Sequence, residues 1–237
     1  MLAPVSAESD VSPGREVLAV DVGGSHVKVL RSSGGERRRF ESGPGLTARE
    51  MVDGVLALTN DWEYDVVSIG VPAPVRDGRV ASEPVNLGRG WVGFDFESEL
   101  GKPTKVANDA AMQALGSYEG GKMLFLGLGT GLGSALVVRG IVEPMELGHL
   151  PFREATFEDY VGERGRKRLG KKKWLEAVAE TIDRLTAALE PDYVVLGGGN
   201  AKKLDELPPN TRLGANENAF AGAFRLWDPA MPSPPSG

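Results

Sequence analysis

Short hydrophobic runs separated by turn residues mark the strands that we expect in this chain. Brief runs rich in Val, Ile and Leu are typical of buried strands. They occur at residues 17–20, 27–30, 66–71, 123–126, 135–138 and 193–196, and residues 104–107 have a similar character.

Three other stretches place apolar side chains at helical spacing. Residues 47–59 and 109–118 are two of them. The clearest apolar stripe predicts a helix over residues 172–189, which Pro191 ends. Its members are Trp174, Val178, Ile182, Leu185 and Leu189. Because strands and helices alternate along the chain, the expected class is α/β.

The composition indicates glycine-rich turns and excludes several classes of function. The chain has 32 glycines in 237 residues, and they cluster rather than repeat. A net charge of −6 argues against a polycation that binds nucleic acid over its whole surface. Without cysteine there are no disulfides, thiolate zinc sites or iron–sulfur clusters. No apolar run approaches a membrane helix and no signal peptide is recognisable, so we expect a cytoplasmic protein without a membrane partner.

Glycine clusters follow three predicted strands, in DVGGSH (21–26), GLGTGLG (127–133) and GGG (197–199). A dinucleotide fingerprint must lead from a strand into a helix, whereas the 127–133 turn leads into another strand. Residues 116–122 approach a P-loop, but Met123 stands where Ser or Thr is required. One glycine hairpin is compatible with an ordinary tight turn. Two of them and a third cluster favour close approach of the backbone to a phosphate, nucleotide or sugar.

The order of the motifs resembles one known family. DVGGSHVK (21–28), GVPAPV (70–75), NLGRGW (86–91), AND (107–109), GTGLG (129–133), ELGH (146–149) and LGGGN (196–200) follow one another as in ROK-family sugar kinases, members of the actin/hexokinase/Hsp70 superfamily. The resemblance covers roughly residues 17–227 and is greatest to the polyphosphate glucokinase branch. It implies an α/β, actin-like ATPase (ribonuclease H-like) fold with two lobes and a central cleft. We expect lobes at 15–107 and 108–228 and disordered tails at 1–14 and 229–237.

The chain departs from the family pattern in two places. ROK proteins carry a zinc-binding cysteine motif after Glu-x-Gly-His, and residues 150–163 contain no cysteine, so no structural zinc is expected. Only 20 residues precede Asp21, which is too few for the helix-turn-helix domain of ROK repressors, so no DNA partner is expected.

By resemblance, Asp109 is the catalytic base that accepts the proton of the sugar 6-hydroxyl. The residue pattern by itself also allows Asp109 to be a helix N-cap. The sugar ligands implied are Asn86, Asn108, Asp109, Glu146, His149 and Glu158, since carboxylates and amides pair with hydroxyl groups. Glu146 and His149 share a face if they are helical, whereas Gly148 favours a loop. His149 and Asn86 are also compatible with structural roles.

The resemblance places the phosphate donor on the glycine loops. Asp21 organises Mg²⁺ through water, and Gly23, Gly24 and Ser25 line the transferred phosphoryl group. Lys28 either reaches phosphate or lies on a solvated strand face. The remaining phosphate or nucleotide ligands implied are Gly129, Thr130, Gly131, Gly198 and Gly199. If the donor is not a nucleotide, Gly198 and Gly199 serve only as elements of the fold.

Residues 164–173 (RGRKRLGKKK) form a basic segment without an acid, while the rest of the chain has 20 basic and 33 acidic residues. Its members are Arg164, Arg166, Lys167, Arg168, Lys171, Lys172 and Lys173. We interpret it as a track for polyphosphate, with a solvated surface and a nucleic-acid contact as alternatives. Gly165 and Gly170 are expected to interrupt any helix here.

These features predict a phosphotransferase with an alcohol acceptor. The predicted enzyme is a glucokinase that transfers a phosphoryl group from polyphosphate, ATP or both to the 6-hydroxyl of glucose or a similar hexose, with Mg²⁺. A homodimer is common in the family that the chain resembles, but the sequence does not determine the oligomeric state. The alternative is a non-catalytic sugar-binding or regulatory protein derived from such kinases.

Overall fold

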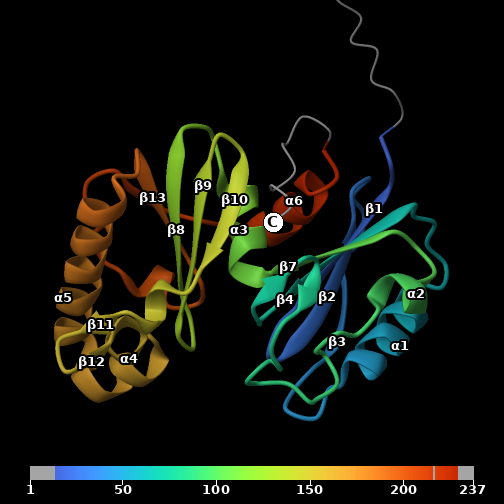
Figure 1. Ribbon diagram of the computed structural model, residues 1–237, viewed down its shortest axis with the longest axis horizontal. Coiled ribbons are helices and arrows are strands. Elements are labelled where there is room, and N and C mark those ends of the chain that lie inside the picture. Colours follow the sequence, from blue (N-terminus) through green and yellow to red (C-terminus); the bar gives the residue numbers. More distant parts are fainter. Residues whose placement is uncertain (1–13, 216, 229–237) are drawn as a thin grey trace, which may run out of the picture.

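The computed structural model describes residues 14–215 and 217–228. The predicted tails at 1–14 and 229–237 therefore lie outside the described residues, except for Gly14. The chain forms two lobes side by side, each built on a five-stranded sheet (Figure 1). The predicted α/β class is confirmed.

The two sheets have the same order and direction of strands. In each, three antiparallel strands are followed by two that run parallel to the first strand of the lobe. The first sheet consists of β3 (Arg38–Glu41), β2 (His26–Arg31), β1 (Val17–Val22), β4 (Val66–Val71) and β7 (Thr104–Asn108). The second consists of β10 (Ile141–Met145), β9 (Leu132–Val138), β8 (Lys122–Leu128), β13 (Tyr193–Gly197) and β14 (Thr211–Leu213).

Alternation of side chains along the strands gives each sheet two buried faces. In the first lobe, Leu18 and Val20 join the core under α1 (Ala48–Leu58), whereas Ala19 faces α6 (Asn218–Arg225). In the second, Leu124 packs with α5 (Glu163–Leu189), whereas Phe125 packs with α3 (Asp109–Ser117).

Helices α3 and α6 lie together between the two sheets (Figure 1). Their backbones approach so closely that a Cβ at Gly116 would lie 1.8 Å from the Asn218 carbonyl oxygen, and one at Gly222 would lie 1.8 Å from that of Met112. The Ser68 hydroxyl also donates to the Ala223 carbonyl at 2.7 Å. Helix α6, which the sequence places in the second lobe, thus packs on the first sheet. The lobe boundary at residue 107 stays a prediction.

Small elements complete the lobes: α2 (Phe96–Leu100) and the hairpin of β5 (Val75–Arg76) and β6 (Arg79–Val80) in the first, and α4 (Phe157–Val161) with the hairpin of β11 (Pro151–Phe152) and β12 (Ala155–Thr156) in the second. Among the described helices, none combines the length and the apolar character needed to cross a membrane.

Helix α5 begins nine residues before the predicted start at residue 172. The expected interruption is correct at Gly170, whose φ is 75°. It is wrong at Gly165, where the helix continues. A Cβ on Gly165 would lie 2.2 Å from the Tyr160 carbonyl oxygen, so this glycine allows the first turns of α5 to pack against α4.

Candidate active site

Asp109 is the first residue of α3, directly after the last residue of β7. The preceding Asn108 is the N-cap: its Oδ1 accepts from the backbone N–H groups of Ala110 and Ala111, at 2.9 and 3.2 Å. Its Nδ2 donates to the Ala73 carbonyl at 3.2 Å. The N-cap alternative for Asp109 is therefore wrong, and Asn108, a predicted sugar ligand, has its side chain bound to the backbone.

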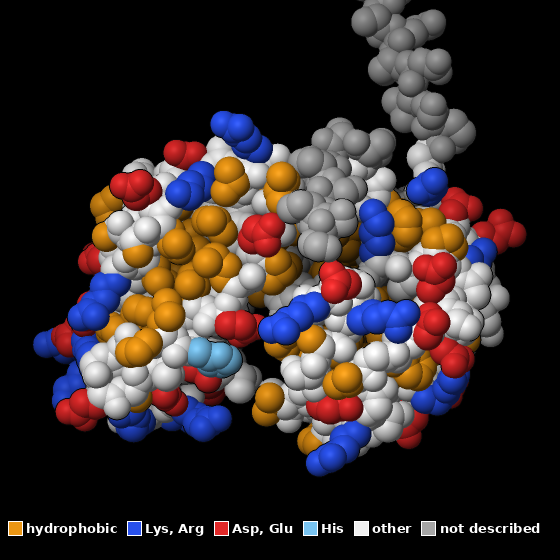
Figure 2. Space-filling model, viewed as in Figure 1, with side chains coloured by type: hydrophobic (Ala, Val, Ile, Leu, Met, Phe, Trp, Pro, Cys, Tyr) orange, Lys and Arg blue, Asp and Glu red, His pale blue; other side chains and the backbone are white. Residues whose placement is uncertain are grey.

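The Asp109 carboxyl lies where carboxylates of both lobes converge. Its pKa is raised to about 6, chiefly by burial and in smaller part by the negative charges of Asp21 and Glu146, while hydrogen bonds from the backbone act to lower it. Asp21 belongs to β1 of the first sheet, and Glu146 follows β10 of the second. As a whole residue, Asp109 is half-buried. Figure 2 shows the hollow between the lobes.

The first glycine loop joins β1 to β2. The Gly23 N–H donates to the His26 carbonyl at 2.9 Å, whereas neither Gly24 nor Ser25 donates a backbone hydrogen bond within the described chain. Lys28 donates to the Asp21 carboxylate at 3.1 Å, so it points at this acid. The loop therefore offers two adjacent N–H groups beside an ion pair.

The second glycine loop joins β8 to β9 and offers the same kind of surface. Thr130 and Gly131 donate no backbone hydrogen bond to any residue that the structure describes. Ala110, one residue after Asp109, lies close to this loop, since a Cβ on Gly133 would be 3.0 Å from the Ala110 Cβ. Asp109 is thus near the turn end of this hairpin.

The glycines of these two loops are not explained by left-handed backbone angles. None of Gly23, Gly24, Gly129, Gly131 and Gly133 has a φ in the left-handed region. A Cβ on Gly129 would meet nothing within 4 Å, and one on Gly24 would make only an ordinary contact, 3.6 Å from the Asn86 Cβ. Glycine at such positions leaves room for a ligand to approach the backbone. The interpretation as ordinary hairpin turns remains an alternative for Gly23, Gly131 and Gly133, where a Cβ would crowd a neighbouring atom.

Two predicted sugar ligands meet beside the second loop. The Glu158 carboxylate lies against Gly131, because a Cβ there would be 2.4 Å from Glu158 Oε2. Its Oε1 is 3.8 Å from His149 Nε2. Glu146 directly precedes a 3₁₀ turn, Leu147–His149, and His149 is the last residue of that turn. Both side chains are exposed. Asn86, also exposed, lies across the cleft beside Gly24.

The third glycine cluster contains both a structural glycine and an open one. Gly198 has a φ of 80°, and a Cβ there would lie 2.4 Å from the Leu128 carbonyl oxygen, so the fold requires glycine. Gly199 has nothing within 4 Å of a Cβ. The next residue, Asn200, is 5% exposed and contacts the second loop. Sequence reasoning did not identify it, although it directly follows the cluster.

The basic segment begins at the second loop. The Glu163 N–H, at the start of α5, donates to the carbonyls of Gly129 and Thr130, at 3.0 and 3.1 Å. Arg166 then binds the Glu163 carboxylate in a forked pair at 2.8 and 2.9 Å. Farther along, Lys171 pairs with Asp205 at 2.9 Å. Lys172 and Lys173 are exposed and form no ion pair within the described residues.

Two shallow hollows of the surface are lined by other residues. One of about 300 Å³ is lined by Glu119, Tyr193, Asn210, Thr211 and Arg212, and another of about 460 Å³ by Leu30, Arg37, Glu217, Phe220, Ala221 and Phe224. Neither contains a predicted site residue.

The first glycine loop lies beside a carboxylate, Asp21, that suits magnesium. Mg²⁺ keeps several waters and takes few protein ligands besides substrate phosphates. Asp21 fits that requirement: Lys28 contacts only its Oδ2, and the free N–H groups of Gly24 and Ser25 lie on the adjoining loop. Within the described residues, no group of three or more His, Asp or Glu side chains could hold a metal without a substrate.

Comparison with known proteins supports the resemblance seen in the sequence. No protein-family profile matches the chain. It is 25% identical over 228 residues to the polyphosphate glucokinase of Mycobacterium tuberculosis (strain CDC 1551 / Oshkosh), with 85% of this chain and 86% of that protein covered. The inorganic polyphosphate/ATP-glucomannokinase of Arthrobacter sp. strain KM has the same fold, with a TM-score of 0.75 at 24% identity over 89% of this chain and 97% of that one. A ROK family glucokinase from Streptomyces griseus, solved in complex with glucose and AMPPNP, matches with a TM-score of 0.66 at 18% identity over 90% and 98% of the two chains.

The resemblance to the ROK sugar kinases is confirmed. The actin-like fold of two lobes is confirmed with it. Its relatives are phosphotransferases with an alcohol acceptor, which confirms the predicted enzyme class. In this fold, the Asp109 carboxyl lies near Asp21 of the first sheet and near Glu146, which follows β10 of the second.

Proposed function

We propose that the protein is a hexose kinase that phosphorylates the 6-hydroxyl of glucose, with polyphosphate, ATP or both as donor. The observation that carries the proposal is the position of Asp109 between two glycine loops with free N–H groups. Its raised pKa, about 6, suits a group that accepts a proton near neutral pH.

The transfer needs one proton movement and one displacement at phosphorus. The sugar O6 attacks the terminal phosphorus of the donor as the Asp109 carboxylate takes the O6 proton. The bond from phosphorus to the bridging oxygen breaks, and ADP or the shortened polyphosphate leaves with the electron pair. Free N–H groups of Gly24, Ser25, Thr130 and Gly131 bind the phosphate oxygens in the two loops. Mg²⁺, held near Asp21, supplies neutralisation of phosphate charge when bound.

Sugar recognition falls on residues of both lobes. Glu146, His149 and Glu158 come from the second lobe, and Asn86 comes from the first. Asn108 contributes to the shape of the sugar site rather than to hydrogen bonding with the sugar, because its amide already binds the α3 N-terminus and Ala73. This division favours a sugar that is bound completely only when the lobes close.

The basic segment supports polyphosphate as one donor. It starts where Glu163 contacts the second loop, and Lys172 and Lys173 remain available for a polyanion. Lysine gives phosphate contacts without a fixed direction, which suits a chain that slides. Gly198 is required by the fold and so gives no support for adenine binding by itself.

A direct assay tests the proposal. Formation of the hexose 6-phosphate is measured separately for glucose and for mannose as acceptor, with ATP and with polyphosphate in parallel, each with Mg²⁺. Product with at least one donor supports a kinase and names its donor. No product with either donor, together with glucose binding by calorimetry, supports the sugar-binding protein instead.

The basic segment has its own test. Replacing Lys171, Lys172 and Lys173 with Gln should raise the KM for polyphosphate about tenfold and change the KM for ATP less than twofold. Added salt should weaken polyphosphate use more than ATP use, since exposed charges are screened. Equal effects on both donors would identify a merely solvated surface, and retention of a labelled oligonucleotide by the unaltered protein alone would favour nucleic acid.

The other expectations stay predictions. They are a homodimer, the absence of DNA and membrane partners, the absence of structural zinc and a cytoplasmic location. Size-exclusion chromatography with light scattering checks the first of them.

A further inference from the structure

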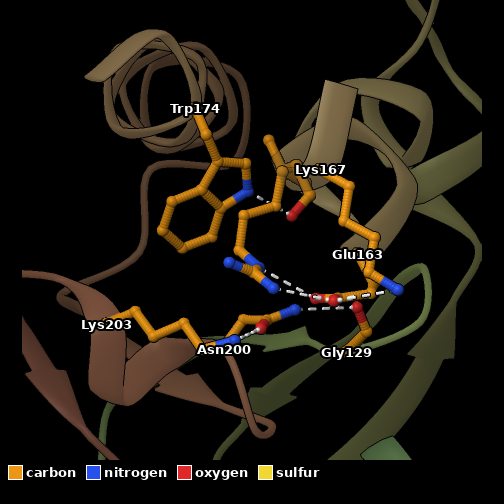
Figure 3. A network of polar contacts seen from close by, with 8 residues as sticks. Gly129, Glu163, Lys167, Trp174, Asn200 and Lys203 are labelled. Atoms are coloured by element: carbon orange, nitrogen blue, oxygen red, sulfur yellow. Dashed lines mark hydrogen bonds and ion pairs between the residues drawn. The ribbon is translucent and has the colours of Figure 1, made fainter. Parts of the chain in front are cut away.

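Asn200 is a buried polar residue that joins two of the glycine clusters. It follows β13 and Gly199, and its backbone N–H donates to the Leu128 carbonyl at 2.9 Å. Its side-chain Nδ2 donates to the Gly129 carbonyl at 3.2 Å (Figure 3). Gly129 lies 71 positions earlier in the chain. A single side chain therefore ties the turn after β13 to the second glycine loop.

Lys203 fixes which way the Asn200 amide faces. Its Nζ contacts the Asn200 Oδ1 at 2.7 Å (Figure 3). An ammonium can only donate, so the atom that it contacts must be the amide oxygen. The nitrogen is then left to face Gly129 and Glu163. The Arg166 guanidinium and, to a smaller extent, the Asn200 amide lower the pKa of Glu163 to about 2.

These contacts set the direction of the free N–H groups in the loop. In a trans peptide, the carbonyl of one residue and the N–H of the next point to opposite sides. The Gly129 carbonyl is held by Asn200 Nδ2 and by the Glu163 N–H, so the Thr130 N–H points away from both. The Thr130 carbonyl is held by the Glu163 N–H at 3.1 Å, so the Gly131 N–H also points away from α5.

We propose that Asn200 is the positioning residue of the donor loop. By holding the Gly129 carbonyl, it fixes the aim of the Thr130 N–H group and so sets the affinity for the phosphate donor without touching it. The proposal rests on the proposed function, because it assigns the donor to this loop. Glu163 assists through its backbone, which no side-chain substitution removes.

Asn200→Asp tests the role with little change in shape. The variant keeps an oxygen for Lys203 but replaces the donor to Gly129 with a second carboxylate oxygen. The KM for the donor should rise at least tenfold and kcat should fall, while the dissociation constant for glucose, measured by calorimetry, should change less than twofold. Affinity for tripolyphosphate, measured in the same way without turnover, should fall by a similar factor. Asn210→Asp makes the same chemical change at an exposed position of the same lobe and should alter neither value.

The outcomes separate this proposal from the proposed function. If the unaltered enzyme phosphorylates glucose and N200D has an unchanged donor KM and tripolyphosphate affinity, the positioning role is wrong and the kinase assignment stands. Equal losses for glucose and donor would show a general structural role and also overturn the proposal. If N200D does not fold, Asn200→Ala removes the same donor without adding a charge and must show the same selective loss. An unaltered protein that binds neither tripolyphosphate nor ATP would overturn both.

Discussion

The two glycine hairpins offer the same surface but are held in different ways. The first loop is fixed by its own sheet: Ser42, just after β3, donates through its hydroxyl to the Gly23 carbonyl at 2.5 Å and through its N–H to the Ser25 carbonyl at 3.0 Å. The second loop is fixed by Glu163 and Asn200, which belong to α5 and to the turn after β13. The first loop therefore folds with its hairpin, whereas the second depends on elements that are distant in the sequence.

The charges beside the loops differ as well. An acid and a base, Asp21 and Lys28, flank the first loop, whereas buried Leu128 and Leu132 flank the second. The proposed function assigns the metal and the transferred group to the first loop and the backbone contacts to the donor to the second. Under that proposal, one hairpin topology would serve two chemical tasks because the neighbouring residues differ.

The largest expected effect concerns Asp109, the residue that both loops approach. Asp109→Asn should lower kcat at least a thousandfold, because the amide cannot accept the O6 proton, while glucose binding should stay nearly unchanged. Steady-state kinetics and calorimetry measure the two quantities. Turnover within tenfold of the unaltered enzyme would contradict the assignment of the base.

The same variant should be more stable at neutral pH. The folded-state pKa of Asp109, about 6, exceeds its ordinary value, so the folded protein binds this proton more tightly than the unfolded chain. The stabilising contribution is complete below about pH 3.8 and is lost as the pH rises through about 6. At pH 8, Asp109→Asn should raise the free energy of unfolding by about 1 to 3 kcal/mol, measured by urea denaturation. Activity of the unaltered enzyme should fall as the pH drops below about 6.

A pair of alanine substitutions compares the support of the two loops. Gly162→Ala should lower the free energy of unfolding by about 1 to 3 kcal/mol, because its Cβ would lie 2.6 Å from the Thr130 carbonyl oxygen, a backbone atom. Gly24→Ala should change it by less than about 0.5 kcal/mol, since its Cβ makes an ordinary contact with Asn86. Urea denaturation of both variants checks the difference. Equal free energies of unfolding for the two variants would show that the second loop accommodates an added Cβ as readily as the first.

The last prediction concerns Gly131, where a small effect on stability is expected. Its Cβ in Gly131→Ala would displace only the flexible end of Glu158, so the free energy of unfolding should change by less than about 1 kcal/mol. The KM for glucose should nevertheless rise severalfold, because Glu158 is a proposed sugar ligand. Glu158→Gln provides the comparison, and a glucose KM that moves in one variant only would separate the carboxylate from the loop.

The sequence by itself determined the periodic elements and the loops. Short apolar runs predicted β1, β2, β4, β8, β9 and β13, and the helical stripe predicted most of α5. Each of these signals lies within one short continuous segment of the sequence, so it can be recognised without knowing the fold. The motif order singled out Asp109 as the candidate base, a role that stays a prediction. The edge strands β3, β10 and β14 carry weaker hydrophobic patterns and were missed.

Only the tertiary structure decided which groups act together. Local spacing could not choose between Asn108 and Asp109 as the N-cap, since both residue types favour that position. Nor could it show that Asp21 and Glu146 raise the pKa of Asp109, or that Asn200 reaches Gly129, because these residues meet only after both sheets pack around α3 and α5. Periodicity and turn chemistry are local properties of the chain, whereas charge proximity and long-range hydrogen bonds exist only once the lobes are assembled.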